Sequence, residues 1–113
     1  MRGCILLQAE HKLVPFARAA FEAYWRDDED ISQDEVLARV SVRAGVDPAF
    51  LFAGIVTPAI KDRLRANTEE LIKRGGFGSP TIFVGGTDMY FGNDRLRLVR
   101  AAIERWRTKS AAE

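Results

Sequence analysis

The strongest constraint on the fold is a series of helix start and stop signals in the first two thirds of the chain. Asp47 and Thr57 are each followed at once by proline, a pairing that places an N-cap before a proline in the first helical turn. Gly45 and the pair Gly75–Gly76 stand where helices are expected to end, because glycine readily adopts the left-handed conformation past a C-cap. Residues 1–74 are therefore predicted to be mostly helical.

The spacing of apolar side chains assigns a buried face to these helices. One helix is expected over residues 2–11 and a second from Leu13, and Ser32 with Glu35 forms a capping box that opens a third. The second helix is predicted to bury a stripe at helical spacing: Val14, Ala17, Phe21, Tyr24 and Trp25. The third is predicted to bury Val36, Leu37, Val40 and Ala44. These faces would form the core of the helical segment.

The pattern changes in the last third of the chain. Two β-prone runs, Thr81–Val84 and Met89–Phe91, flank a turn at Gly85–Gly86, which is typical of a β-hairpin. Asn93 or Asp94 can cap a final helix. Its inner face is predicted to consist of Leu96, Val99, Ile103 and Trp106, so both tryptophans of the chain are expected in the core. The predicted fold class is therefore α+β and mostly helical.

Composition and charge argue against several function classes. The 113 residues carry 17 basic and 16 acidic side chains, a net charge of +1, so neither nucleic acid nor a membrane is an expected partner. No secretion signal or membrane-spanning run is recognised, and we expect a cytoplasmic protein. Cys4, the one cysteine, lies in an apolar run and is expected to be a packed, inert thiol. No metal site is predicted, because the acidic run 27–30 is expected to be a solvated loop and His11 a surface residue.

The stretch from Phe77 to Thr81 is the candidate for chemistry. Pro80 stands at the mouth of the first predicted strand, where a residue without an N–H group is tolerated. If the Ser79–Pro80 bond is cis, the main-chain groups of Ser79 are exposed and free to pair with an extended, peptide-like ligand. Composition alone leaves two interpretations open, an ordinary loop-to-strand turn and a ligand clamp.

Two motifs in order carry a family resemblance. Residues 75–81 read Gly-Gly-Phe-Gly-Ser-Pro-Thr and residues 91–96 read Phe-Gly-Asn-Asp-Arg-Leu, and three helical runs match as well: 21–25, 30–32 and 35–38. This order resembles the C-terminal part of the 2-hydroxychromene-2-carboxylate isomerases, of the DsbA-like thioredoxin clan, which are similar to kappa-class glutathione transferases. The resemblance implies a helical insertion segment, residues 1–74, and the C-terminal ββα portion of a thioredoxin-like fold, residues 75–113. Together these are expected to form one compact domain, with the N-terminal βαβ portion missing.

The family pattern also implies a glutathione site. Pro80 resembles the cis-proline of thioredoxin-like folds, which would let the Ser79 main chain bind the cysteinyl part of glutathione. Asn93 and Asp94 match the polar pair that holds the γ-glutamyl end. Asp94 can accept from the glutamyl ammonium, and the amides at the helix start favour the carboxylate of the glutamyl group. Capping of the last helix by these two residues is the alternative, and it is compatible with binding.

The resemblance implies a glutathione-dependent isomerase-like protein that acts on a small aromatic substrate in the degradation of aromatic compounds. The family serine that contacts the glutathione sulfur lies upstream of the matching region, so no catalytic residue is assigned and a truncated form is expected. Because the missing strands would cover the hairpin, a homo-oligomer is also expected. Two alternatives stay open: a fragment of a DsbA-like thiol–disulfide oxidoreductase, and a non-catalytic binding or assembly domain.

Overall fold

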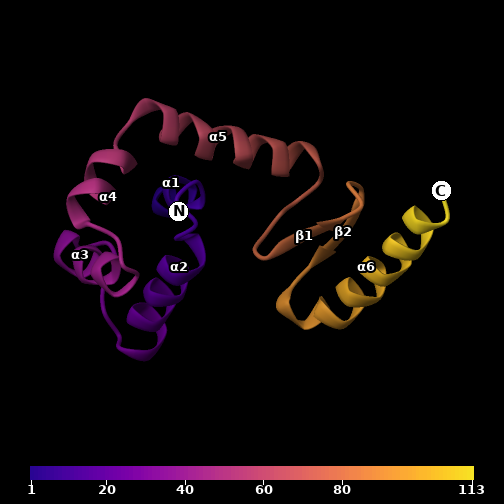
Figure 1. The fold of residues 1–113 in the computed structure, drawn as a ribbon, viewed down its shortest axis with the longest axis horizontal. Helices are drawn as coiled ribbons and strands as arrows, with labels where there is room; N and C mark the ends of the chain where they lie inside the picture. Colours follow the sequence, from indigo (N-terminus) through magenta and orange to yellow (C-terminus); the bar gives the residue numbers. More distant parts are fainter. The chain divides into compact units, whose positions relative to one another are not determined.

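Six α-helices and one β-hairpin make up most of the computed structural model, which describes residues 1–113 (Figure 1). The helices are α1 (Arg2–Gln8), α2 (Leu13–Phe21), α3 (Asp34–Arg43), α4 (Pro48–Ile55), α5 (Pro58–Lys73) and α6 (Leu96–Ala111). A π-helix, Glu22–Arg26, continues α2, and a 3-10 helix, Asn93–Arg95, leads into α6. The strands are β1 (Thr81–Val84) and β2 (Asp88–Phe91). The predicted class, α+β and mostly helical, is confirmed.

The chain forms two compact units, Met1–Ala66 and Asn67–Glu113. The boundary falls within α5, which has no buried residue along its length. The division at residue 75 into two parts of one domain stays a prediction. No helix is both long enough and apolar enough to cross a membrane.

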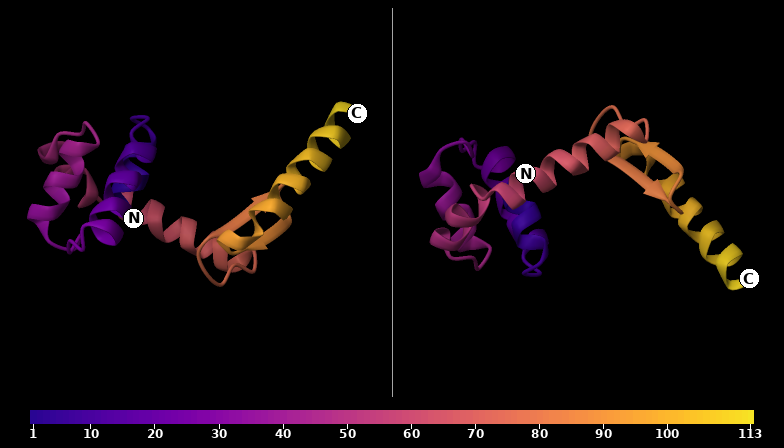
Figure 2. Two further views of the ribbon diagram at one scale, coloured as in Figure 1. Left: turned by 90° about the horizontal axis from the view of Figure 1, so that it is seen from below. Right: turned by 90° about the horizontal axis from the view of Figure 1, so that it is seen from above.

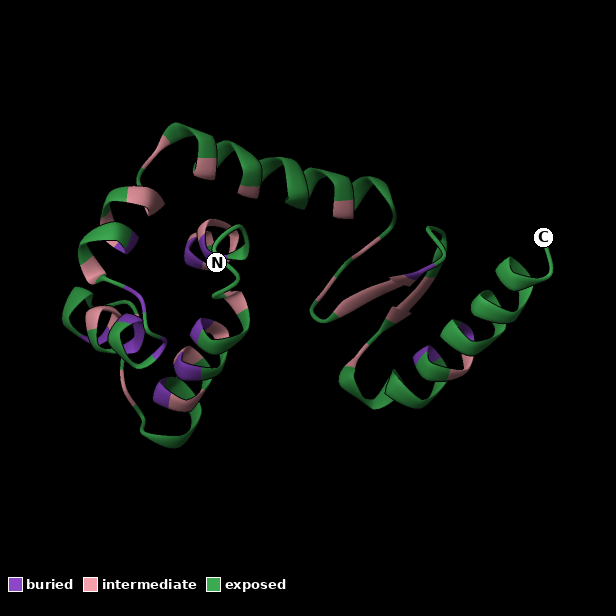
Figure 3. Cartoon of the chain, viewed as in Figure 1, coloured by how far each residue is buried: buried purple, intermediate pink, exposed green.

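The first unit has a single apolar core to which α1, α2, α3 and α4 all contribute (Figure 3). Leu7 of α1, Val40 of α3 and Leu51 of α4 are fully buried, and Phe16 of α2 is buried beside them. Helices α1 and α3 each pack against both α2 and α4. The core receives Val36 and Val40 of α3 and Ala44 just past its end, with Leu37 packed against them, which confirms the predicted face.

The buried face of α2 differs from the one predicted. Val14, Phe21 and Trp25 are 73%, 64% and 75% exposed, and Tyr24 is exposed as well. The core instead receives a different set at helical spacing: Phe16, Ala19 and Ala23. Nearly every residue from 13 to 25 is apolar, so spacing alone could not select the inward face. The π-helix also has a wider turn than an α-helix, which changes the direction of the side chains that follow.

Most of the helix start and stop signals act as predicted. Gly45 follows α3 with a φ of 72°, and Gly75 follows α5 with a φ of 86°. The Asp47 carboxylate accepts from the N–H group two residues further on at 2.9 Å, which caps α4. Thr57 behaves differently, since its hydroxyl donates to the Gly54 carbonyl at 2.8 Å. Local chemistry therefore sets the ends of α3, α4 and α5.

The capping box predicted at Ser32 and Glu35 is wrong. The Ser32 hydroxyl and N–H group both donate to Asp30 Oδ1, at 2.6 and 3.0 Å, and Gln33 Nε2 donates to Asp30 Oδ2 at 3.2 Å. Helix α3 begins at Asp34, without a side-chain cap hydrogen bond. The Ser32 hydroxyl is bonded to the nearby Asp30 carboxylate and is therefore not available to cap the helix. Short polar side chains commonly make such local hydrogen bonds in turns.

The hydrogen bonds to Asp30 make the stability of the first unit depend on pH. They lower the pKa of Asp30 below its ordinary value, with the bond from the Ser32 hydroxyl as the largest cause. The unfolded chain then binds this proton at a higher pH than the folded chain. The stabilisation is therefore fully present above about pH 5 and is lost as the pH falls through the lowered pKa of the folded chain. We expect Asp30→Asn to flatten the loss of stability between about pH 5 and about pH 3 in urea unfolding followed by circular dichroism.

The matched control is Asp62→Asn in α5, because this carboxylate is exposed and makes none of those hydrogen bonds. It should keep the pH profile of the unmodified chain. Part of the acid loss should persist in Asp30→Asn, because a hydrogen bond from Arg26 also lowers the pKa of Asp27. An acid loss as steep in Asp30→Asn as in the unmodified chain would contradict the role given to Asp30.

In the second unit β1 and β2 form an antiparallel pair. The register runs from Thr81 opposite Phe91 to Val84 opposite Asp88. The two glycines of the predicted turn have φ values of 62° and 95°, a conformation that other residues rarely adopt. The hairpin predicted from the sequence is therefore confirmed.

Helix α6 packs on the hairpin over only part of its length. Val99 and Ala102 of α6 are buried together with Val84 of β1, and Ile82 and Tyr90 pack against them. The predicted inner face of α6 is otherwise wrong, since its remaining members are exposed: Leu96, Ile103 and Trp106. Strands of four residues are too short to cover a helix of 16 residues, and the C-terminal half of α6 extends past them (Figure 2).

Candidate functional site

The open end of the hairpin brings together the two segments that carry the predicted site residues. Ser79 and Pro80 precede β1, and Asn93 and Asp94 follow β2. The Gly92 N–H group donates to the Pro80 carbonyl at 3.0 Å, one step beyond the last strand pair. All four predicted residues are exposed, so a ligand can reach them.

The Ser79–Pro80 peptide bond is cis, the geometry that the ligand-clamp interpretation requires. A hydrogen bond closes the turn around this peptide bond, because the hydroxyl of Thr81, the residue after Pro80, donates to the carbonyl of Gly78, the residue before Ser79. The turn is thus held on one side by this bond and on the other by the bond between Pro80 and Gly92. It presents the Ser79 main chain at the edge of the hairpin.

Neither Asn93 nor Asp94 caps the last helix with its side chain. The 3-10 helix and α6 both begin without a side-chain cap hydrogen bond, so the capping alternative is not observed. Gly92 has a φ of 105°, and a Cβ added to it would lie 2.5 Å from Asp94 Oδ1. The Asp94 carboxylate therefore lies against the same glycine that is bonded to Pro80. The Asp94 carboxylate can therefore accept from the ammonium of an amino-acid end group, and the uncapped N–H groups at the start of the 3-10 helix can donate to its carboxylate.

The first unit contains an apolar hollow of about 490 Å³, bordered by α1, α2, the π-helix, α3 and α4. Four aromatic side chains contribute to its wall: Phe16, Phe21, Tyr24 and Trp25. The Tyr24 and Trp25 rings meet edge to face with centroids 4.8 Å apart. Cys4 is half-buried at the wall and packs against the core, as predicted, and Arg2 adds a charge. The sequence interpretation missed this hollow because it assigned the exposed aromatic residues to the core.

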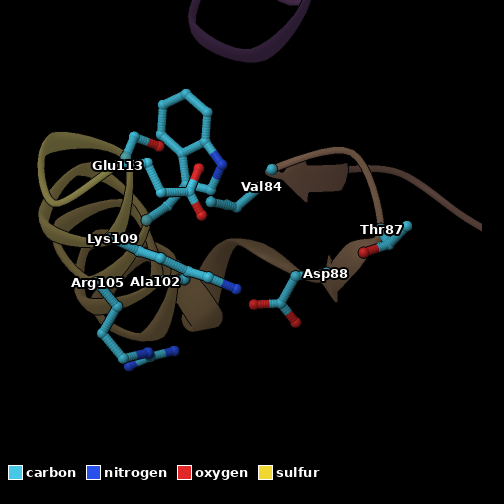
Figure 4. A pocket seen from close by; sticks show the side chains of 10 residues that line it. Val84, Thr87, Asp88, Ala102, Arg105, Lys109 and Glu113 are labelled. Atoms are coloured by element: carbon cyan, nitrogen blue, oxygen red, sulfur yellow. The ribbon is translucent and has the colours of Figure 1, made fainter.

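A second hollow of about 430 Å³ lies between the turn of the hairpin and α6, within the second unit (Figure 4). Asp88 lines it and accepts from the Tyr90 hydroxyl at 2.7 Å, a hydrogen bond that raises the pKa of Tyr90 above its ordinary value. Arg105 and Lys109 line the side formed by α6. None of the predicted site residues borders this hollow, because they lie at the opposite end of the hairpin.

The predicted surface histidine and the metal-ligating residues add no further site. His11 is exposed, as predicted, in a turn with a φ of 55°. The structure has no group of three histidine, cysteine or acidic side chains arranged to hold a metal ion. The open end of the hairpin, with the four residues predicted from the sequence, and the apolar hollow are therefore the two features considered for small-molecule ligands.

A helical segment followed by a hairpin, a cis-proline at the mouth of the first strand and a C-terminal helix fit a thioredoxin-like class of protein. The sequence model of the DSBA-like thioredoxin domain matches residues 1–104. The chain belongs to this DSBA-like thioredoxin family.

Relatives with two different names match most of the chain. Glutathione S-transferase kappa 1 of Rattus norvegicus is 30% identical over 109 residues, which cover 90% of this chain and 48% of the relative. The Homo sapiens protein of the same name is 30% identical over 115 residues, covering 94% and 51%. The 2-hydroxychromene-2-carboxylate isomerase of Pseudomonas putida is 30% identical over 97 residues, covering 86% and 47%. The chain thus spans about half the length of these curated relatives.

Proposed function

We propose that this chain forms the glutathione-binding part of a glutathione-dependent isomerase-type protein that acts on a small aromatic substrate. The observation that carries the proposal is the open end of the hairpin, where Ser79–Pro80 and Asn93–Asp94 meet. The names of the relatives, glutathione transferase and isomerase, support it. No catalytic residue is assigned within the chain. The homo-oligomer, the cytoplasmic location and the role in aromatic degradation stay predictions.

Glutathione fits this end of the hairpin because it is an extended peptide with a charged amino-acid group at one end. The Ser79 N–H and carbonyl groups would pair with the cysteinyl residue, as neighbouring strands pair in a sheet. The Asp94 carboxylate would accept from the γ-glutamyl ammonium, and the uncapped N–H groups at the start of residues 93–95 would donate to the carboxylate of the same group. The ligand would then span the open end from one segment to the other.

The apolar hollow of the first unit is the proposed site of the aromatic substrate. Its volume of about 490 Å³ lies in the range usual for small-molecule sites. Aromatic walls favour flat rings, which can stack on or meet the edges of Tyr24 and Trp25. Arg2 at the wall can pair with an anionic group of the substrate.

Calorimetric titration with reduced glutathione tests the proposed cradle. We expect saturable binding that weakens by roughly tenfold to a hundredfold in Asp94→Ala, because a hydrogen bond between charged partners is lost. Cysteinylglycine, which lacks the γ-glutamyl group, should bind weakly and with equal affinity to both chains. The matched control is Asp62→Ala, which removes an exposed carboxylate and the same charge from α5.

Three results would argue against this assignment. Undetectable binding of glutathione to the unmodified chain would overturn the cradle. An equal loss of glutathione affinity in Asp62→Ala and Asp94→Ala would show that the effect comes from the change in net charge. Binding that does not depend on Asp94 would overturn the role given to this carboxylate, whereas failure to bind glutathione together with a stable oligomer would favour the non-catalytic alternative.

A further inference from the structure

We propose that Phe91 is a positioning residue of the glutathione cradle. Its ring would fix the spacing between the turn that presents Ser79 and the segment that carries Asp94. This inference rests on the proposed function and adds to it a residue that touches neither end of the ligand. It is carried by the contacts of the Phe91 ring on one side and of its main chain on the other.

The ring of Phe91 packs directly against the turn before β1. A Cβ added to Gly78 would lie 2.6 Å from Phe91 Cε2, so the ring occupies the space that any other residue at position 78 would need. The Phe77 ring adds a second contact, with centroids 4.7 Å apart and planes tilted by 46°. Gly78 is in turn joined to Thr81 through the threonine hydroxyl. The turn around Ser79 therefore leans on the Phe91 ring.

The main chain of Phe91 leads straight into the other half of the cradle. Phe91 is paired with Thr81 in the last step of the hairpin, and the next residue, Gly92, is bonded to the Pro80 carbonyl. Asp94 follows two residues later and lies against Gly92. Phe91 is thus the residue whose side chain contacts one half of the cradle while its main chain positions the other.

The exposure of Phe91 indicates that its ring supports the turn before β1 more than it contributes to the core of the second unit. Phe91 is 42% exposed and is absent from the buried cluster of the second unit, which consists of Val84, Val99 and Ala102. Strand alternation places Phe91 on the same face of the hairpin as Phe83, away from the residues that pack on α6. Replacing Phe91 by a smaller side chain should therefore leave the core of the second unit intact.

Phe91→Leu tests the inference, with Phe83→Leu as the matched control on the same face of the hairpin. We expect Phe91→Leu to weaken glutathione binding by about fivefold to tenfold, and Phe83→Leu to change it by less than about twofold. Phe91→Tyr should restore the affinity because it keeps the ring. The double variant Phe91→Leu/Asp94→Ala should lose less than the product of the two single effects, because Phe91 acts by positioning Asp94, whose contact with the ligand Asp94→Ala has already removed. The affinity for cysteinylglycine should not change, since this ligand uses one end only.

Phe77→Leu provides a second variant that weakens the ring contact without altering the strand, and it should reproduce part of the loss. Equal binding by Phe91→Leu and Phe83→Leu, or fully multiplicative effects in the double variant, would overturn the inference and leave the proposed function intact. A loss for cysteinylglycine equal to that for glutathione would do the same, because it would show general loosening of the turn. Failure of the unmodified chain to bind glutathione would overturn both.

Discussion

Leu51→Ala is expected to lower the free energy of unfolding of the first unit by about 2–5 kcal/mol. Leu51 is fully buried in α4, and its Cδ1 lies 3.3 Å from the position that a Cβ on Gly3 of α1 would occupy. Truncation would remove apolar contacts and leave a cavity that the close approach of α1 and α4 cannot easily fill. Small domains have total stabilities of only about 5–15 kcal/mol, so this one change would remove a large fraction of the total.

Hydrogen–deuterium exchange resolved by peptide is the suitable measurement, because it reads residues 1–66 separately from the rest of the chain. Faster exchange is expected throughout α1 to α4, with the logarithm of the exchange rate rising in proportion to the lost free energy. The control Leu98→Ala makes the same chemical change in α6 at a side chain that is 51% exposed, and it should cost much less. Similar losses at the two sites would show that Leu51 is not the centre of the core.

Gly92→Ala is expected to destabilise the second unit by about 1–3 kcal/mol and to abolish measurable glutathione binding. Gly92 has a φ of 105° and a ψ of 147°, a region open almost only to glycine. An added Cβ would also meet the Asp94 carboxylate at 2.5 Å, so the backbone or Asp94 has to move. Either movement disturbs the bond between the Gly92 N–H group and Pro80, and with it the spacing of the two binding segments.

Gly86→Ala separates strain from function. Gly86 also has a positive φ, of 95°, but an added Cβ would meet nothing within 4 Å and the residue lies at the closed end of the hairpin. Thermal unfolding should show a loss for both variants, whereas calorimetry should show a loss of glutathione affinity for Gly92→Ala alone. Full affinity in Gly92→Ala would show that the open end does not depend on this conformation.

The features that could be predicted from sequence are those that one or two residues determine by themselves. Asp47 before a proline, Gly45 after α3 and Gly75 after α5 each have a conformational preference strong enough to end or begin a helix in many contexts. The hairpin follows from two glycines between β-prone runs. The cis bond before Pro80 was required by the family resemblance and could not be derived from composition.

The errors concern choices that depend on neighbours distant in sequence. The segment from 13 to 25 is apolar on more than one face, and only the positions of α1 and α3 decide that Phe16 is inside and Trp25 outside. The Ser32 hydroxyl had two possible hydrogen-bond partners, and it is bonded to the Asp30 carboxylate rather than to the main chain of the helix. On α6 the apolar residues continue beyond the short strands, so Trp106 has no sheet to cover it.

Part of the candidate site could likewise be predicted from the sequence, and part could not. Ser79, Pro80, Asn93 and Asp94 could be named from the family motifs, and the hairpin register then explains why they meet. The role of Phe91 could not be foreseen, because its packing on Gly78 is a three-dimensional contact that no spacing rule encodes. The apolar hollow was missed for the same reason, since its walls come from five helical segments: α1, α2, the π-helix, α3 and α4.

The exposure of the two tryptophans gives the chain one intrinsic optical reporter in each unit. Trp25 borders the apolar hollow, so a bound aromatic compound would alter its emission. Trp106 is packed over the hairpin turn, where a Cβ on Gly85 would lie 2.7 Å from its Cδ1, so opening of the turn would alter its emission. Replacing either one by phenylalanine leaves a single emitter whose signal comes from one half of the molecule. Binding of an aromatic compound in the hollow and the integrity of the hairpin can thereby be followed separately without an attached dye.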